Sequence, residues 1–232
     1  MEFQAPVQQM GYDRAIAVFS PEGRMYQVEY ARKAVDKAST VVGVVFAGGV
    51  VLAATRVLQS LMVSDRVEKI AKIDEHIGAA TCGILADCRV LVDIARVGAQ
   101  VNRITYDSRI ETNTLVKDVS DRVQRFTQMG GIRPYGAGLL FAGEGRLYEV
   151  DPSGTMRQWK AHALGRGTKE AKEYLIKNYK DNMPRDNAIK LAVASLRAAE
   201  EKITLKSTEI GVDENGKFYK LQEQELKKAV AE

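Results

Sequence analysis

The chain has 232 residues, of which 45% are hydrophobic, so it is long enough to bury one substantial core, and no Pro-, Ser- or Gly-rich linker divides it. Its formal net charge of +4 comes from 34 basic and 30 acidic residues spread along the chain, without the clustering that a nucleic-acid groove would show. We therefore expect a single domain over residues 1–232 and no nucleic-acid partner.

The N-terminal part combines a turn with an amphipathic helix. Residues 1–10 lack the basic and apolar regions of a signal peptide, and a short strand is expected over residues 15–18. Ser-Pro-Glu-Gly at 20–23 predicts a turn, because proline presets φ at its second position and glycine relaxes its exit. The helix that follows ends near residue 37. Four apolar residues at three- and four-residue spacing share one face of it: Met25, Val28, Ala31 and Val35.

The next segment, residues 38–55, is uncharged over 18 positions, which is borderline for a membrane-spanning helix. It is rich in valine, however, and Ala47-Gly48-Gly49 interrupts it in the middle. Two buried strands, 40–46 and 50–54, joined by a glycine turn explain both features. We expect this hairpin and no membrane partner.

The remaining elements follow in blocks. The patterns predict strands over 70–73 and 77–82, helices over 87–103 and 114–129, strands over 137–142, 146–150 and 155–159, helices over 169–179 and 185–203, strands over 209–212 and 218–220, and a final helix over 222–230. In the first long helix, one apolar side is expected to comprise Val90, Leu91, Ile94, Ala95, Gly98 and Val101. Helices that come in pairs favour antiparallel sheets with outer helix layers, an α+β fold of the four-layer αββα sandwich type.

Few residues are candidates for catalysis or metal binding. Cys82 and Cys88 are too few for a disulfide framework, their spacing is not a usual zinc spacing, and two thiols in a reducing cytoplasm explain them. His76 falls in a polar turn and is expected to be exposed, whereas His162 has no evident role. No metal and no cofactor is expected, and the localisation is expected to be cytoplasmic.

Ser39 and Thr40 open the apolar hairpin and are the strongest candidates for an enzymatic role. In N-terminal nucleophile hydrolases, a Ser or Thr at this place attacks an acyl carbon, with its own α-amine as base and a lysine assisting. That chemistry requires the chain to begin at the nucleophile, whereas 38 residues precede Ser39 here. A structural Ser-Thr pair is the preferred interpretation, and a self-processed peptidase that uses Ser39 or Thr40 is the alternative.

Lys69 opens a later strand, either as a solvated residue or as a fixed cation at the end of a pocket.

Several motifs together resemble those of proteasome α-type subunits, of the archaeal kind, over nearly the whole chain. They are Tyr12-Asp13-Arg14, Phe19-Ser20-Pro21-Glu22-Gly23-Arg24, Gln27-Val28-Glu29-Tyr30-Ala31, Val67-Glu68-Lys69-Ile70, Ala86-Asp87 and Gly130-Gly131-Ile132-Arg133-Pro134-Tyr135-Gly136. The resemblance implies the N-terminal nucleophile hydrolase-like sandwich over residues 39–232, preceded over residues 1–38 by a gate tail, a turn and the family's N-terminal helix.

The resemblance also implies a function without peptide-bond chemistry. Seven α subunits would form an outer ring, the threonine-type peptidase activity would belong to partner β subunits, and unfolded proteins would pass the axial pore. The gating residues that it implies are Tyr12, Asp13, Pro21 and Tyr30. The implied docking residues for the C-terminal tails of AAA ATPases or other activators are Lys69, Gly83 and Glu29.

Three positions depart from the family pattern. Ala38 stands where a glycine usually precedes Ser-Thr, and Thr55-Arg56 replaces an acidic residue followed by basic ones. The acidic residue helps to build the catalytic centre of active β subunits, so its absence weakens the enzymatic alternative further. Residues 162–167, His-Ala-Leu-Gly-Arg-Gly, replace the usual small and hydroxyl residues.

Overall fold

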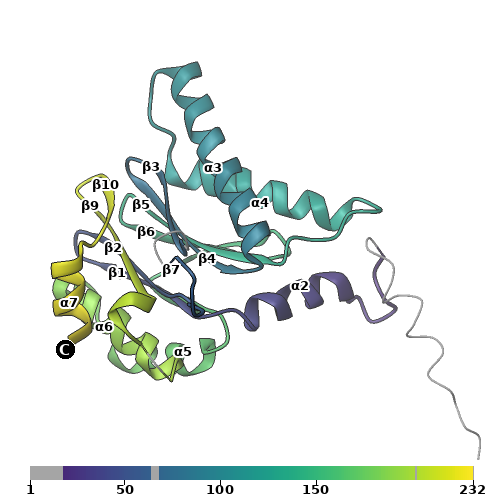
Figure 1. Ribbon diagram of the computed structural model, residues 1–232. Coiled ribbons are helices and arrows are strands. Elements are labelled where there is room, and N and C mark those ends of the chain that lie inside the picture. The colour runs from purple at the N-terminus through teal and green to yellow at the C-terminus, as the bar shows by residue number, and fades with distance from the viewer. Residues whose placement is uncertain (1–17, 64–67, 202, 232) are drawn as a thin grey trace, which may run out of the picture.

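Two five-stranded antiparallel sheets lie face to face at the centre of the molecule (Figure 1). The computed structural model describes residues 18–63, 68–201 and 203–231. The first sheet has the order β10-β9-β2-β1-β8 and the second the order β3-β4-β5-β6-β7. The strand bounds are β1 Val41–Phe46, β2 Gly49–Thr55, β3 Ile70–Asp74, β4 Ile77–Gly83, β5 Ala137–Gly143, β6 Arg146–Val150, β7 Met156–Trp159, β8 Ala161–Leu164, β9 Thr208–Glu214 and β10 Lys217–Lys220.

Helices cover the outer face of each sheet, so the expected αββα sandwich is confirmed (Figure 1). Helices α3 (Leu85–Tyr106) and α4 (Thr112–Gln128) pack on the second sheet. Helices α5 (Thr168–Asn178), α6 (Arg185–Ala199) and α7 (Glu223–Ala231) lie on the side of the first sheet, and a short 3₁₀ turn, η2 (Leu205–Ser207), precedes β9. The four layers enclose three apolar clusters, one between the sheets and one beneath each helix layer.

The valine-rich segment forms the expected hairpin of β1 and β2, with Val41 paired to Ala54 and Phe46 to Gly49. Its alternate residues serve two clusters: Val50 and Leu52 face the second sheet, whereas Val51 packs beneath the outer helices. This burial on both faces accounts for the uncharged run. Within the residues described, no helix is both long enough and apolar enough to span a membrane.

Two of the predicted helices differ from the structure. Leu91 and Ala95 are buried, but Val90 and Val101, expected on the same side of α3, are exposed. The apolar residues of α3 run around more of its circumference than one sheet can cover, so packing decides which of them is buried. Helix α6 ends at Ala199, four residues earlier than expected, because Glu200 is extended and its carboxylate binds the start of β1.

One strand was missed, and one further expectation was wrong. Strand β8, which pairs with β1, was not predicted, because Ala-His-Ala-Leu is short and has little β propensity of its own. His76 was expected to be exposed, yet only 4% of its surface is accessible, and its Nε2 lies 2.8 Å from the carbonyl oxygen of Ile110. The loop after α3 covers the β3–β4 turn and encloses the ring. The strand expected over 15–18 falls mostly on residues 15–17, outside the described part of the chain, and Val18 belongs to no strand.

Candidate functional site

The predicted turn is present and leads into helix α2 (Tyr26–Asp36), which projects from one end of the sandwich (Figure 1). The amide of Gly23 donates to the carbonyl oxygen of Ser20 at 2.8 Å, and Gly23 has φ +74°. Ser20 is buried and closes the turn, since its hydroxyl accepts from the amide of Arg24 at 3.1 Å. Pro21 lies exposed at the tip of the turn. The turn is thus a fixed structure with a solvent-facing proline.

Two of the predicted functional residues lie along α2 itself. Glu29 receives a two-pronged hydrogen bond from Arg24, at 2.8 and 2.5 Å, and this contact lowers the pKa of its carboxyl group. Tyr30 is 42% exposed, and the ammonium of Lys33 lies 5.5 Å from the centre of its ring. The gating candidates Tyr12 and Asp13 fall outside the described residues.

A groove of about 660 Å³ runs between the first half of α2 and the end of α4. Phe19, Met25 and Val28 supply its apolar side, and Gln124 and Thr127 supply polar groups from α4. The groove is closed toward the β6–β7 turn, where Arg32 donates to Asp151 at 2.7 Å. Helix α2 therefore packs on β4 and β5, and its first half lies beside an open surface next to the end of α4.

Lys69, the predicted docking cation, is only 4% exposed. Its ammonium donates to both the carbonyl oxygen and the hydroxyl of Ser39, each at 2.7 Å. Burial lowers its pKa, and no carboxylate of the described residues forms an ion pair with its Nζ. Lys69 is therefore not a solvated surface residue, and its side chain is fixed on Ser39.

The backbone of Lys69 is held by Glu209 of β9, a buried carboxylate. Its oxygens accept from the amide of Lys69 at 3.3 Å and from that of Ile70 at 2.9 Å. Arg56, one of the departures from the family pattern, lies 3.3 Å from the same carboxylate. Glu209 thus fixes the start of β3, and sequence reasoning missed it because 140 residues separate it from Lys69.

Gly83 lies at the same end of the sandwich, where β4 ends against β5. It has φ +123°, and a Cβ atom there would lie 2.1 Å from the carbonyl oxygen of Gly136. The next amide, that of Ile84, donates to the same carbonyl at 2.8 Å. Gly136 in turn approaches Ala34 of α2. The predicted docking residues Lys69 and Gly83 therefore both lie near the C-terminal end of α2, whereas Glu29 lies about 9 Å away along the helix.

Replacing Gly83 by alanine is expected to destabilise the fold by about 3 kcal/mol, because the backbone conformation is strained for any side chain and the clash is with backbone. This corresponds to a fall in Tm of about 6–12 °C at fixed protein concentration. Gly145→Ala is the control. Gly145 also has positive φ, but a Cβ there meets no atom within 4 Å, so a loss of about 1 kcal/mol is expected. Equal losses for the two variants would contradict the role of the close approach.

Thr40, the second candidate nucleophile, is fully engaged in a buried network. Its amide and its hydroxyl both donate to Glu200 at 2.8 Å, and the hydroxyl accepts from the amide of Gly167 at 3.1 Å. Arg166 donates to the other carboxylate oxygen at 2.9 Å. Burial alone would raise the pKa of Glu200, but the hydrogen bonds from Arg166 and Thr40 outweigh it and lower that pKa. The network ties the start of β1 to the end of α6.

A second carboxylate network holds the motif at residues 130–136. Asp87, in the first turn of α3, binds the guanidinium of Arg133 at 2.6 and 2.8 Å and accepts from the amide of Gly136 at 2.9 Å. The contact with Arg133 lowers the pKa of Asp87. Both residues stood in motifs that the sequence singled out, but nothing in the sequence indicated that they pair.

His162, for which the sequence suggested no role, closes the edge between the sheets. It is buried, stacks on Trp159 with 4.0 Å between ring centres, and its Nε2 lies 3.4 Å from Glu149. The indole of Trp159 donates to Glu149 at 2.7 Å. Burial lowers the pKa of His162. The residue at this departure from the family pattern is thus a buried structural histidine.

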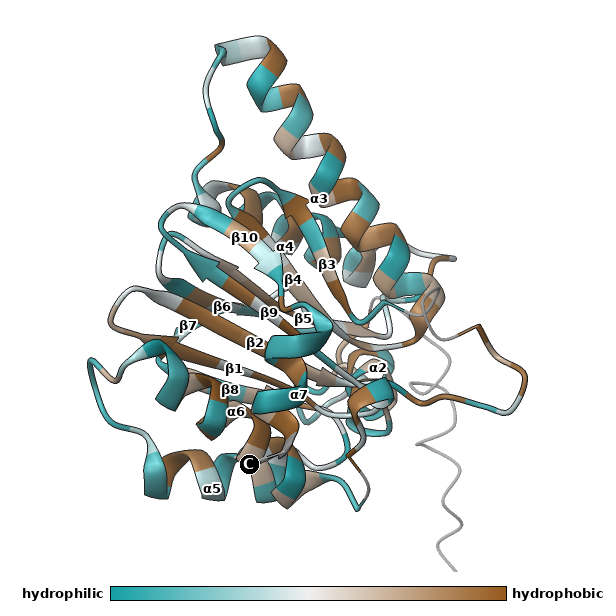
Figure 2. Ribbon diagram, turned by 60° about the vertical axis from the view of Figure 1, so that its left-hand side comes forward, coloured by the Kyte–Doolittle hydropathy of each residue, from teal (hydrophilic) through white to brown (hydrophobic). Residues whose placement is uncertain are grey.

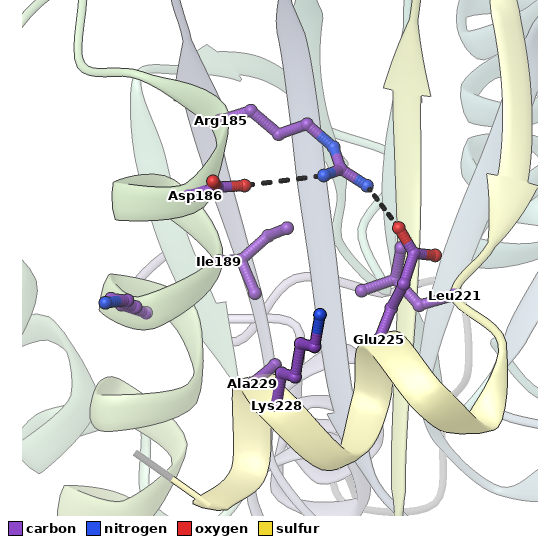
Figure 3. Close-up of a pocket in the computed structure, with 8 residues that line it drawn as sticks. Arg185, Asp186, Ile189, Leu221, Glu225, Lys228 and Ala229 are labelled. Atoms are coloured by element: carbon purple, nitrogen blue, oxygen red, sulfur yellow. Dashed lines mark hydrogen bonds and ion pairs between the residues drawn. The ribbon is translucent and has the colours of Figure 1, made fainter.

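A pocket of about 330 Å³ lies between α6 and α7, away from α2 (Figure 3). Arg185 forms ion pairs with both acidic residues of its lining, 3.4 Å from Asp186 and 3.3 Å from Glu225. Cys82 and Cys88 are buried free thiols, and burial raises their pKa values to about 12 and about 11. Across the described ranges, no group of three or more His, Cys, Asp and Glu is placed to hold a metal ion.

Comparison with known proteins agrees with this geometry. A family model described as "Proteasome subunit" matches residues 35–213, and a model of the N-terminal signature of A-type proteasome subunits matches residues 12–34. The chain is 48% identical over 230 residues to the proteasome alpha subunit of Methanosarcina acetivorans, covering 96% of this chain and 93% of that protein. It is 45% identical over 226 residues to the protein of the same name from Methanocaldococcus jannaschii, covering 94% and 87%.

Proposed function

Because the chain belongs to the proteasome alpha-subunit family, we propose that it is a non-catalytic subunit of the outer, heptameric ring of a 20S proteasome core in the cytoplasm. In this proposal, the ring gates substrate entry and docks activator tails, and partner β subunits cleave unfolded proteins. The observation that carries it is the match of the α-type signature to residues 12–34, whose described part is a rigid turn and a docked helix. Residues 1–38 form the gate segment, and residues 39–232 form the sandwich.

The native mass of the purified chain tests this proposal directly. Seven copies of a 25.6 kDa chain give about 179 kDa, and electron microscopy of the same sample should show a seven-fold ring or a stacked pair. A full-length monomer that stays monomeric in the presence of β subunits would overturn the proposal.

Helix α3 supports assembly, because it carries a largely exposed apolar seam formed by Val90, Ile94, Val97, Val101 and Ile104. The spacing alternates between four and three residues, as in a coiled-coil seam. Val97 is 61% and Ile104 is 85% exposed in the single chain, and the apolar colouring along α3 is visible in Figure 2. We propose that a helix of a partner proteasome subunit covers this seam.

The double change Val97→Asp with Ile104→Asp is expected to weaken assembly with partner subunits by about 100-fold, because each side chain would contribute about 1.5 kcal/mol when buried. The Tm of the isolated chain should stay within about 1 °C, since both positions are exposed. Ile176→Asp on α5 is the control, being equally exposed but outside the seam. The native mass after mixing with β subunits provides the readout. Unchanged assembly of the double variant would show that this seam is not the assembly surface.

The gating role of Tyr12, Asp13, Pro21 and Tyr30 remains our proposal. Aromatic contacts and a carboxylate hydrogen bond between neighbouring tails would hold an ordered open state, one of two discrete arrangements.

Pro21→Gly is expected to change activator-stimulated peptide hydrolysis about fivefold, because the loss of the preset φ costs about 1 kcal/mol in an ordered turn. Glu22→Gln, beside it in the same exposed turn, is the control. If activators stimulate the Pro21 variant as strongly as the wild type, Pro21 has no role in gating.

The alternative, a self-processed peptidase, is favoured by one observation: the Lys69 ammonium donates to the hydroxyl of Ser39 at 2.7 Å, within reach of a lysine that assists this nucleophile. Against it, the residues before Ser39 are folded into α2, whose Val35 is buried in the core. Intact mass distinguishes the two functions, because processing would remove residues 1–38 if Ser39 is the nucleophile and residues 1–39 if Thr40 is.

A further inference from the structure

Helices α6 and α7 form a pocket on the side of the first sheet, apart from the residues proposed for gating and docking (Figure 3). Its volume of about 330 Å³ lies at the lower end of the range of ligand pockets, about 300–1,000 Å³. Ile189 of its lining belongs to the apolar cluster beneath α6, and Leu221 and Ala229 pack against that cluster. A small apolar molecule bound here would therefore extend an existing apolar core.

Both acidic residues of the lining are engaged by the same guanidinium. As noted above, Arg185 forms ion pairs with Asp186 and Glu225. A third carboxylate, that of Glu214 on β9, lies 3.6 Å from its Nε. The acidic residues of the pocket therefore compensate Arg185, and they do not favour a cationic ligand.

Lys228 is a basic residue of the lining that the protein leaves to solvent. Its exposed side chain points into the pocket (Figure 3), and among the described residues no carboxylate forms an ion pair with its Nζ. The adjacent Lys227, in contrast, pairs with Glu223 at 2.7 Å. The pocket thus presents an ammonium beside an apolar surface, and a few polar groups on an apolar lining are typical of ligand sites.

We propose that this pocket binds small carboxylic acids with an apolar body, of the medium-chain fatty acid type. The carboxylate pairs with the ammonium of Lys228, and the hydrocarbon lies on Ile189, Leu221 and Ala229. A single ammonium suits a monoanion, whereas the nearly double charge of a phosphate ester would also be repelled by the two acidic residues of the lining. The site is independent of the proposed proteasome function, since it shares no residue with it.

Titration of octanoate into the full-length chain, in the oligomeric state in which it is purified, tests the proposal by calorimetry. 1-Octanol has the same hydrocarbon without the charge, and octanoate is expected to bind about fivefold more tightly, the upper limit for an exposed ion pair. Each methylene added between butanoate and octanoate should tighten binding about fourfold until the pocket is full.

Two matched variants of α7 locate the carboxylate. Lys228→Gln is expected to bind octanoate no more tightly than 1-octanol, whereas Lys227→Gln should keep the fivefold preference, because Lys227 does not line the pocket. Both lysines are exposed, so the Tm of each variant should stay within about 1 °C of the wild type. Ala229→Phe fills the pocket and should abolish binding of both probes while Lys228 is still present.

Three results would overturn the proposal. The absence of saturable octanoate binding would show that the pocket is not a ligand site. Equal affinities for octanoate and 1-octanol in the wild type would show that Lys228 does not select an anion. An equal loss in the two lysine variants, or unchanged binding by Ala229→Phe, would place octanoate outside the pocket.

Discussion

Replacing Lys69 by alanine is expected to reduce activator-stimulated peptide hydrolysis to the basal rate in particles assembled with β subunits. The variant removes the buried cation that has no ion-pair partner among the described carboxylates, and with it the group that a terminal carboxylate would bind. The loss at one site is that of one hydrogen bond between charged groups, about 2 kcal/mol or thirtyfold in affinity. Where several tails bind one ring together, the losses multiply, which accounts for the large effect.

Lys72→Ala is the control for this prediction. Lys72 lies three residues further along, on β3, but its side chain is exposed. Stimulation by the Lys72 variant should be that of the wild type. Native mass should show assembled rings for both variants, because Glu209 still holds the backbone at residue 69. If activators stimulate the Lys69 variant as strongly as the wild type, Lys69 is not part of the docking site.

The second large effect is expected from Glu200→Ala, which should destabilise the fold by about 3 kcal/mol. The variant leaves the amide and hydroxyl of Thr40 without their acceptor in a site with no solvent access, and it breaks the pair with Arg166. A fall in Tm of about 6–12 °C at fixed protein concentration is the readout. Glu201→Ala, at the exposed neighbouring position, should change Tm by less than about 2 °C.

The contribution of Glu200 also depends on pH in a definite direction. The pKa of the Glu200 carboxyl is lower in the folded protein than in the unfolded chain, where it is about 4.3. Glu200 therefore contributes its full stabilisation above about pH 4.3, and this contribution is lost as the pH falls through the lower pKa of the folded protein. The difference in Tm between wild type and Glu200→Ala should therefore be constant from pH 6 to 8 and shrink below pH 4. A difference that stays constant down to pH 3 would contradict this assignment.

The proposed gating residue Pro21 and the proposed docking residues Lys69 and Gly83 lie at opposite ends of one short helix, and the proposed docking residue Glu29 lies nearer to Pro21. Pro21 and Glu29 belong to the N-terminal half of the segment, whereas Ser39, Lys69 and Gly83 gather at its C-terminal end. Helix α2 is 11 residues long, about 16 Å, and its buried residues attach it along one side. A short, rigid helix of this kind can carry a displacement from one end to the other without unfolding.

Local pattern alone determined most of the architecture. The turn at residues 20–23, the apolar face of α2 and the hairpin of β1 and β2 follow from proline and glycine chemistry and from periodicity, which act between neighbours in the chain. The family followed from the same local motifs, because the signature at residues 12–34 is contiguous.

Only the tertiary structure decided what the polar residues do. Ser39 and Lys69 are 30 residues apart, Thr40 and Glu200 160 apart, and Asp87 and Arg133 46 apart, so no local pattern indicates these pairs. His76 was misjudged for the same reason, since a distant loop covers it. Burial and charge pairing depend on which segments meet in space, because a buried charge is stable only where a polar partner from another segment reaches it.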